Sequence, residues 1–129
     1  MSECGYRTKK DMLWNYRHLN VITSKVIQYN TLEIVTAKET IINYHDTAII
    51  TRDNKTGTET LENDGFFTPT TKDRMIRYSR NGVTIFQRQG AWYVRTEKGF
   101  SEYFNGIEIK KNGFIVKSLT GIKTNSQCL

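Results

Sequence analysis

Few residues of this chain are suited to covalent or metal chemistry. The 129 residues include two cysteines, two histidines and one proline. Cys4 and Cys128 lie near opposite ends, so they can pair only if the termini meet, and reduced thiols are the expected state. The serines lack a Gly-x-Ser-x-Gly elbow, no glycine-rich phosphate loop is present, and the acidic residues are scattered. We therefore expect no metal site and no cofactor, and we favour a function other than catalysis.

The chain also lacks a long apolar run. No stretch approaches the length of a membrane span, and the N-terminus is polar where a signal peptide needs an apolar core. We therefore expect a cytoplasmic protein with no membrane partner. The hydrophobic content is only 37%, but seven Tyr, six Phe and two Trp can bury large areas, and 129 residues suit one domain, 1–129.

Net charge is the strongest compositional signal of function. Nineteen Lys and Arg against thirteen Asp and Glu give a formal net charge of +6. Such a balance favours association with anions, although it carries no information about the fold. Two interpretations stay open: a basic protein without a nucleic-acid partner, or a binder of an anionic ligand.

A helix is predicted over about 70–81, in the middle of the chain. Thr70 and Thr71 can cap the free amides of a first turn, and Pro69 is tolerated at the start of a helix but not inside it. Asn81-Gly82 supplies the stop, because glycine accepts the left-handed conformation that ends many helices. At about 100° per residue, one half of the helix surface is apolar and the other is rich in arginine. The apolar half holds Met75, Ile76, Tyr78 and Ser79, and the other half holds Asp73, Arg74, Arg77 and Arg80.

Strand patterns dominate the rest of the chain. Residues 83–88 and 91–95 are β-branched and aromatic and flank Gln89-Gly90, which predicts a hairpin. Similar segments lie at 24–29, 31–37, 40–46, 47–53, 58–63, 100–105, 107–111 and 114–119, and turn residues at 54–57, 63–65, 105–106 and 112–113 bound the later ones. We predict an α+β fold: a twisted, mostly antiparallel sheet of about six strands with one well-defined helix packed on it.

The two ends of the chain are less regular. Met12, Leu13, Tyr16 and Leu19 have helical spacing, so residues 1–20 are either a short helix or an irregular arm. Residues 123–129 show no pattern and are expected to fray. An exposed edge strand would invite pairing with a second copy, so a homo-oligomer is one expectation.

His45 is the histidine with the most chemistry around it. It stands between Tyr44 and Asp46, with Thr47 next, in a segment that we predict to be a strand. A histidine beside a carboxylate can act as a general base or hold an anion. In a strand, however, neighbours point to opposite faces and form no dyad, so a structural hydrogen-bonding role is favoured.

The main candidate site is the arginine-rich helix face. Thr71 and Lys72 stand at the helix N-terminus, where free amides and the dipole favour negative charge. Rings of the hairpin, at Phe86, Trp92 and Tyr93, can stack on bases if they are exposed, and Arg88 and Arg95 lie nearby. The alternative is structural: a capping threonine, solvated arginines and core aromatics. The candidate ligand-binding residues are Thr71, Lys72, Arg74, Arg77, Arg80, Tyr44, His45 and Trp92.

Three segments resemble a family of small tailed-bacteriophage proteins. In that family a His-x-Thr strand precedes a Thr-Thr-Lys-x-Arg-Met helix start and a Gln-x-x-Gly-x-Trp hairpin. The corresponding segments here are 44–49, 65–75 and 86–94, and the likeness covers about residues 31–107. The resemblance implies a phage origin and an accessory, host-directed role in the cytoplasm of a bacterial host, and it implies no mechanism.

Three functions therefore remain open. The first is a non-enzymatic phage accessory protein that binds an anionic ligand, either nucleic acid or a nucleotide such as a host defence signal. The second is an inhibitor that blocks a host protein by direct contact through a sheet edge or an aromatic patch. The third is a small hydrolase or nuclease that uses His45.

Overall fold

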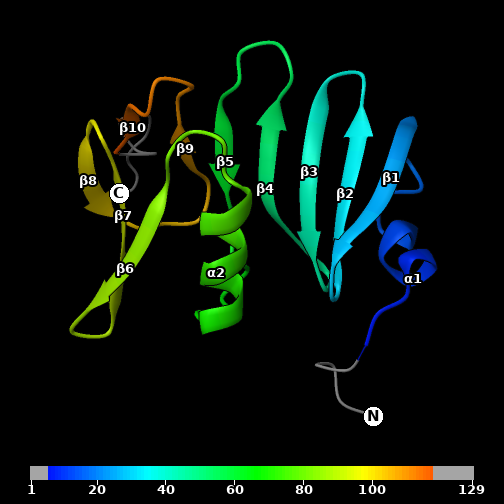
Figure 1. Ribbon diagram of the computed structural model, residues 1–129, viewed down its shortest axis with the longest axis horizontal. Coiled ribbons are helices and arrows are strands. Elements are labelled where there is room, and N and C mark those ends of the chain that lie inside the picture. The colour runs from blue at the N-terminus through cyan, green and yellow to red at the C-terminus, as the bar shows by residue number, and fades with distance from the viewer. Residues whose placement is uncertain (1–5, 118–129) are drawn as a thin grey trace, which may run out of the picture.

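The computed structural model describes residues 6–117, which form two antiparallel sheets and two helices (Figure 1). The larger sheet has the strand order β1 (Val21–Gln28), β2 (Thr31–Thr36), β3 (Glu39–Tyr44), β4 (Thr47–Asp53), β5 (Glu59–Leu61), β9 (Ile107–Ile109), β10 (Ile115–Val116). The smaller sheet has the order β6 (Thr84–Arg88), β7 (Ala91–Thr96), β8 (Gly99–Glu102). The α+β class and the antiparallel pairing are confirmed. The prediction of one sheet is wrong, because the 84–96 hairpin pairs with β8 and not with any strand of the larger sheet.

The predicted N-terminal helix forms but is short. α1 (Lys9–Trp14) begins after Thr8, whose hydroxyl accepts a hydrogen bond from the Asp11 amide at 3.1 Å, while the Thr8 amide donates to the Asp11 carboxylate. This reciprocal pair satisfies amides that have no partner within the helix. The apolar side of residues 9–19 packs as its spacing predicted, with Met12 buried and Leu13, Tyr16 and Leu19 beside it.

Both cysteines and the tail expected to fray, 123–129, lie outside the described residues.

The second helix, α2 (Pro69–Tyr78), starts earlier than predicted. Its N-cap is Thr68, whose hydroxyl accepts a hydrogen bond from the Thr71 amide at 3.2 Å. Pro69 takes the first helical position, where its missing amide leaves no hydrogen bond unmade. Thr70 and Thr71 therefore lie inside the first turn and do not cap it.

The same helix also ends earlier than predicted, at Tyr78 and not at Asn81-Gly82. Ser79 is extended, with ψ of 141°, and its hydroxyl donates to Glu59 at 2.6 Å. The amide of Arg80 donates to the same carboxylate at 2.7 Å. The buried acid on β5 thus competes with the helix for the chain after Tyr78, which the local sequence does not reveal.

The buried face of α2 differs from the expected one. Arg74 and Met75 are buried on it, with Thr71 one turn before them, where the helix packs on β3, β4 and β6. Ile76, which we expected on the apolar side, is 39% exposed. The prediction was wrong at Arg74 because an arginine can be buried when distant parts of the chain supply its hydrogen-bond partners.

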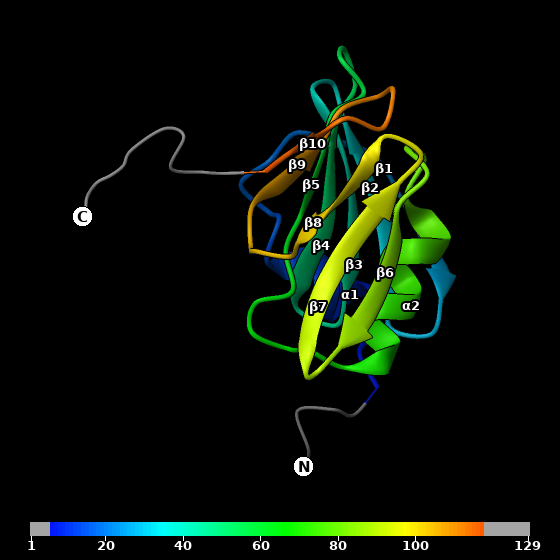
Figure 2. The ribbon, with the colours of Figure 1, turned by 90° about the vertical axis from the view of Figure 1, so that its left-hand side faces the viewer.

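Both faces of the larger sheet carry a core. On one face α2 and the inner side of the smaller sheet enclose the main cluster, and on the other face α1 covers β2 and β3. Ile41 and Ile42 are neighbours in β3 that point to opposite faces, so each joins a different cluster. Figure 2 looks onto the smaller sheet, with α2 beside it. Within residues 6–117, neither helix is long and apolar enough to cross a membrane.

Candidate functional site

Arg74, the centre of the predicted cationic face, is a buried structural residue. Only 8% of it is exposed, and its Nε donates to the Thr31 hydroxyl at 3.0 Å. Its Nη1 lies 3.0 Å from the Asp73 carboxylate, and its guanidinium carbon lies 5.4 Å from the centroid of the Tyr44 ring. The structure thus brings together Arg74 and Tyr44, two of the candidate residues, in a contact that joins α2 to the β1–β2 and β3–β4 turns.

The other cations of the predicted face do not form one continuous strip. Arg77 is half exposed, and its Nε lies 3.7 Å from the carboxylate of Asp73, one turn earlier. Lys72 is half-buried, and Thr71 is buried with only 2% exposed. Arg80 is exposed but follows the end of the helix and points to a different part of the surface. Helix α2 therefore presents Lys72 and Arg77 as its accessible cations.

His45 lies in a turn and not in the predicted strand. It has φ of 60°, a left-handed conformation, between the last residue of β3 and the first of β4. Its Nδ1 lies 3.5 Å from the Asp46 carboxylate, which also pairs with Arg7 at 2.6 Å. The His45 carbonyl accepts a hydrogen bond from Asn43 at 2.9 Å. These contacts tie the N-terminal segment to the turn, and they favour the structural role.

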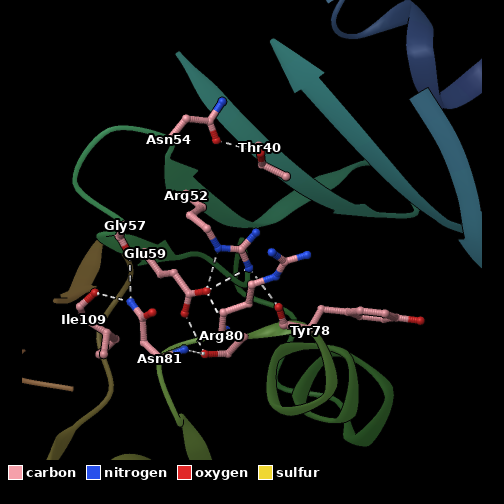
Figure 3. A network of polar contacts seen from close by, with 10 residues as sticks. Thr40, Arg52, Asn54, Gly57, Glu59, Tyr78, Arg80, Asn81 and Ile109 are labelled. Carbon is pink, nitrogen blue, oxygen red and sulfur yellow. Dashed lines mark hydrogen bonds and ion pairs between the residues drawn. The ribbon is translucent and has the colours of Figure 1, made fainter. Parts of the chain in front are cut away.

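The most highly charged buried group in the described chain is the Arg52–Glu59 pair (Figure 3). Glu59 is fully buried and accepts two hydrogen bonds from Arg52, at 2.8 and 3.0 Å. Arg52 also donates to the carbonyl of Tyr78 at 2.9 Å, and Asn81 bridges the carbonyls of Gly57 and Ile109. Every group of this network is occupied by the chain itself, so it fixes the end of α2 on the sheet.

An aromatic surface lies on the outer side of the smaller sheet, with Phe100 exposed and Phe86 and Tyr93 half-buried, and we call it the ring face. Strand register places its side chains together: Phe86 pairs with Tyr93, and Arg95 pairs with Phe100. Because side chains alternate along a strand, Arg88 shares this side with Phe86. The ring face consists of Phe86, Arg88, Tyr93, Arg95 and Phe100.

The rings of this face contact one another and not the core. Phe86 and Tyr93 are stacked, with centroids 5.4 Å apart and planes 15° apart. Phe100 completes the group at 6.4 Å from each of them and is 57% exposed. None of the three belongs to either core cluster. Exposed aromatic groups of this kind mark binding surfaces more often than scattered apolar residues do.

The cations beside these rings are accessible. Arg95 lies over Phe86, with its guanidinium carbon 5.3 Å from the ring centroid. Arg88 and Arg95 are exposed, and neither takes part in an ion pair with the residues that the structure describes. Glu102, opposite Tyr93 on β8, is the acid on this side. Flat rings flanked by free guanidinium groups can stack on planar bases and hold phosphates.

Trp92, which we predicted as a stacking residue, is enclosed. It is 2% exposed and packs edge-on against Phe67 and Tyr103, at 5.0 and 5.4 Å between centroids. Since Trp92 and Tyr93 are adjacent in a strand, their rings lie on opposite sides of the sheet, and Tyr93 is half-buried on the outer side. Trp92 is therefore removed from the accessible surface, and Phe86 and Tyr93 are the hairpin rings that lie on its outer side.

One ring-face residue has no signal in the local sequence. The two-residue turn Gln89-Gly90, both with positive φ, fixes the hairpin register and would have placed Phe86 opposite Tyr93 from sequence alone. Phe100 joins them only because β8 pairs with β7, which turn chemistry between 96 and 99 does not specify. It was missed for that reason.

One comparison with known proteins gives a match. A family model described as Kyanoviridae Gp96 protein matches residues 16–110, roughly three quarters of the chain. The matched segment includes α2, the whole ring face and the 31–107 stretch that resembles tailed-phage proteins. Comparisons with curated proteins and with solved structures gave no match.

Proposed function

This chain belongs to the Kyanoviridae Gp96 protein family and is a phage protein, and from that premise we propose that it is a non-enzymatic accessory protein that binds single-stranded nucleic acid. The binding surface in this proposal is the ring face. The single observation that carries the proposal is the stacked Phe86–Tyr93 pair, which is half-buried on the sheet surface beside exposed Phe100 and beside Arg95, whose guanidinium forms no ion pair with another described residue.

The chemistry of the ring face favours a single strand over a duplex. Bases of a duplex stack on each other and offer their flat sides to no protein ring, whereas unpaired bases can lie on Phe86 and Tyr93. A phosphate between two such bases meets Arg95 or Arg88. The formal net charge of +6 adds attraction along the whole strand. The same chemistry would accept a free nucleotide, but one nucleotide would use only part of the face.

The expected energies are modest for each contact and large in sum. Stacking of a base on an aromatic side chain is worth about 1–3 kcal/mol. Each phosphate held by a cation steepens the slope of log affinity against log salt concentration by about 0.7. Two stacked bases with two phosphates therefore suffice for measurable binding at low salt.

The proposal is tested by fluorescence anisotropy with labelled polythymidine and polyuridine strands of about twelve nucleotides, within the usual site sizes for such domains. We expect Phe86→Ala/Tyr93→Ala to weaken binding by at least about tenfold, since two stacking contacts are lost. The variant should still fold, because neither ring belongs to a core cluster, and a thermal melt checks this.

The chain offers a matched control in a second exposed ring pair. Tyr6 and Tyr29 lie 5.6 Å apart, are 63% and 58% exposed, and belong to a different part of the surface. Tyr6→Ala/Tyr29→Ala should leave the affinity unchanged. Equal losses in both variants, or tighter binding of a duplex of the same length, would contradict the proposal. A loss confined to Lys72→Ala/Arg77→Ala would move the ligand to α2.

A second candidate function, direct contact with a host protein, is favoured by an apolar patch between α1 and β1. Trp14 and Ile22 are 63% and 64% exposed there, and Val26, further along β1, is 49% exposed. Within residues 6–117 β1 pairs with β2 alone. Lys9, Lys10 and Arg17 line the same groove as Trp14 and Ile22. These cations favour an acidic segment as the partner. Cross-linking in nuclease-treated host lysate tests this function: Trp14→Ala/Ile22→Ala should remove the cross-linked protein, and its persistence would exclude this patch.

A further inference from the structure

A small basic cavity lies at one end of the ring face. It has a volume of about 390 Å³ and is lined by Arg80, Asn81, Glu97, Lys98, Lys111 and Asn112. Three segments meet there: the connection from α2 to β6, the β7–β8 turn and the β9–β10 turn. The cavity adjoins the ring face along the chain. Gly82 lies two residues before Thr84, which begins β6, and Glu97 lies two residues after Arg95, the partner of Thr84 on β7.

The charges of this cavity are unbalanced. Arg80, Lys98 and Lys111 are exposed, and none of them forms an ion pair with another described residue. Glu97 is the acidic group in the lining and is also unpaired within the same residues. Three cations against one carboxylate leave a positive site that the fold itself does not neutralise.

Two glycines position the lysine side chains. A Cβ added at Gly57, where φ is +80°, would lie 3.1 to 3.2 Å from side-chain carbons of Lys111. At Gly113, with φ of +98°, it would lie 3.4 Å from Cγ of Lys98. Both lysine stems thus pass close to backbone that carries no side chain, so a larger residue at either glycine would displace them.

The third cation, Arg80, lies in a loop that hydrogen bonds hold against the larger sheet. The backbone amide of Arg80 donates to buried Glu59 at 2.7 Å. Its neighbour Asn81 donates to the carbonyls of Gly57 and Ile109, both at 2.9 Å (Figure 3). The loop that carries Arg80 is therefore fixed to β5 and β9, and the cavity is preformed.

We propose that this cavity is a phosphate site for the nucleic-acid strand whose bases stack on the ring face, an inference that rests on the proposed function. From Phe86 back to Gly82 is four residues, which span at most about 14 Å when fully extended. That length corresponds to about four nucleotides at the 3.4 Å rise of a stacked strand. A dinucleotide on Phe86 and Tyr93 would not reach the cavity, whereas a strand of about twelve nucleotides would.

The experiment measures the affinity of both lengths for Lys98→Ala/Lys111→Ala over a series of salt concentrations. The long strand should bind about tenfold more weakly at low salt, and its logarithmic salt slope should fall by about 1.4, the sum for two phosphates. The affinity of the dinucleotide should not change. Lys9→Ala/Lys10→Ala, which removes the same net charge from α1, is the matched control and should leave the slope unchanged.

Two results would overturn the inference: an unchanged slope in Lys98→Ala/Lys111→Ala, or the same fall in the α1 control. Both leave the proposed function intact if Phe86→Ala/Tyr93→Ala weakens binding by at least about tenfold. The proposed function would instead be excluded if Phe86→Ala/Tyr93→Ala left the affinities of both the dinucleotide and the long strand unchanged. A thermal melt of each variant confirms that the exposed substitutions leave the fold in place.

Discussion

The buried pair Arg52–Glu59 and the ring face use the same side-chain chemistry in opposite ways. Inside the protein, Arg52 donates hydrogen bonds to Glu59 and to the Tyr78 carbonyl. Arg95 lies over a ring at the surface and forms no ion pair with another described residue. The first cation holds α2 against the sheet, and the second is available to a ligand.

This contrast shows how to interpret a basic sequence. Nineteen Lys and Arg are present, yet Arg7, Arg52 and Arg74 are occupied by the chain's own acids, carbonyls and hydroxyls. Cations with internal partners contribute to the fold, and the proposed function therefore rests on cations that have no such partner among the described residues. The candidate site therefore moves from the helix, where Arg74 is occupied, to the outer side of the smaller sheet.

The largest expected effect is on stability, at the buried pair. Glu59→Gln leaves the Arg52 guanidinium buried without its counter-charge, which should lower the free energy of unfolding by about 3–5 kcal/mol. Urea unfolding measures this loss. The double variant Arg52→Met/Glu59→Leu removes both charges and should lose less than Glu59→Gln. A loss below about 1 kcal/mol for Glu59→Gln would break the contrast between the two regions.

The next effect is on binding, at the ring face. Phe100 and Phe114 are 57% and 55% exposed, but Phe100 alone belongs to the ring face. Phe100→Ala should weaken binding of a single strand by about fivefold or more, the value of one stacking contact. Phe114→Ala should leave it unchanged. Anisotropy titrations of both variants sharpen the contrast, and equal effects would assign the binding to general surface hydrophobicity.

The smallest effect concerns an acid that belongs to neither region. Burial raises the pKa of Glu62, with the nearby charge of Asp64 adding to the shift. Since the folded pKa exceeds the unfolded one, the contribution of Glu62 to stability is full below pH 4.5 and is lost as pH rises through the folded pKa. Glu62→Gln should therefore be slightly more stable than the wild type at pH 7 and equal to it below pH 4.5. Thermal melts over pH 4–7 measure the difference, and a variant less stable at pH 7 would contradict the assignment.

Local patterns predicted what local chemistry determines. The hairpin around Gln89-Gly90 and the short N-terminal helix with buried Met12 follow from turn geometry and from apolar spacing. Alternation along β7 also required Trp92 and Tyr93 to lie on opposite sides. The sequence did not specify which side is covered, because that depends on where the smaller sheet packs on the larger one.

Long-range partners account for the failures. Arg74 is buried because Thr31, 43 residues earlier, supplies an acceptor. Helix α2 ends at Tyr78 because Glu59 binds the chain that follows it. Phe100 reaches the ring face through the pairing of β8 with β7. Such contacts come from tertiary packing, so neither helical periodicity nor turn residues could have revealed them.

The central claim is tested most directly by mapping where a single strand binds. Amide spectra of the labelled protein, recorded by nuclear magnetic resonance during titration with polythymidine, report the position of each affected residue. We expect the largest shifts in β6, β7 and β8, around Phe86, Tyr93 and Phe100, with little change in α1 and β1. Shifts concentrated on α2 or on the α1–β1 patch, with the smaller sheet unaffected, would contradict the claim.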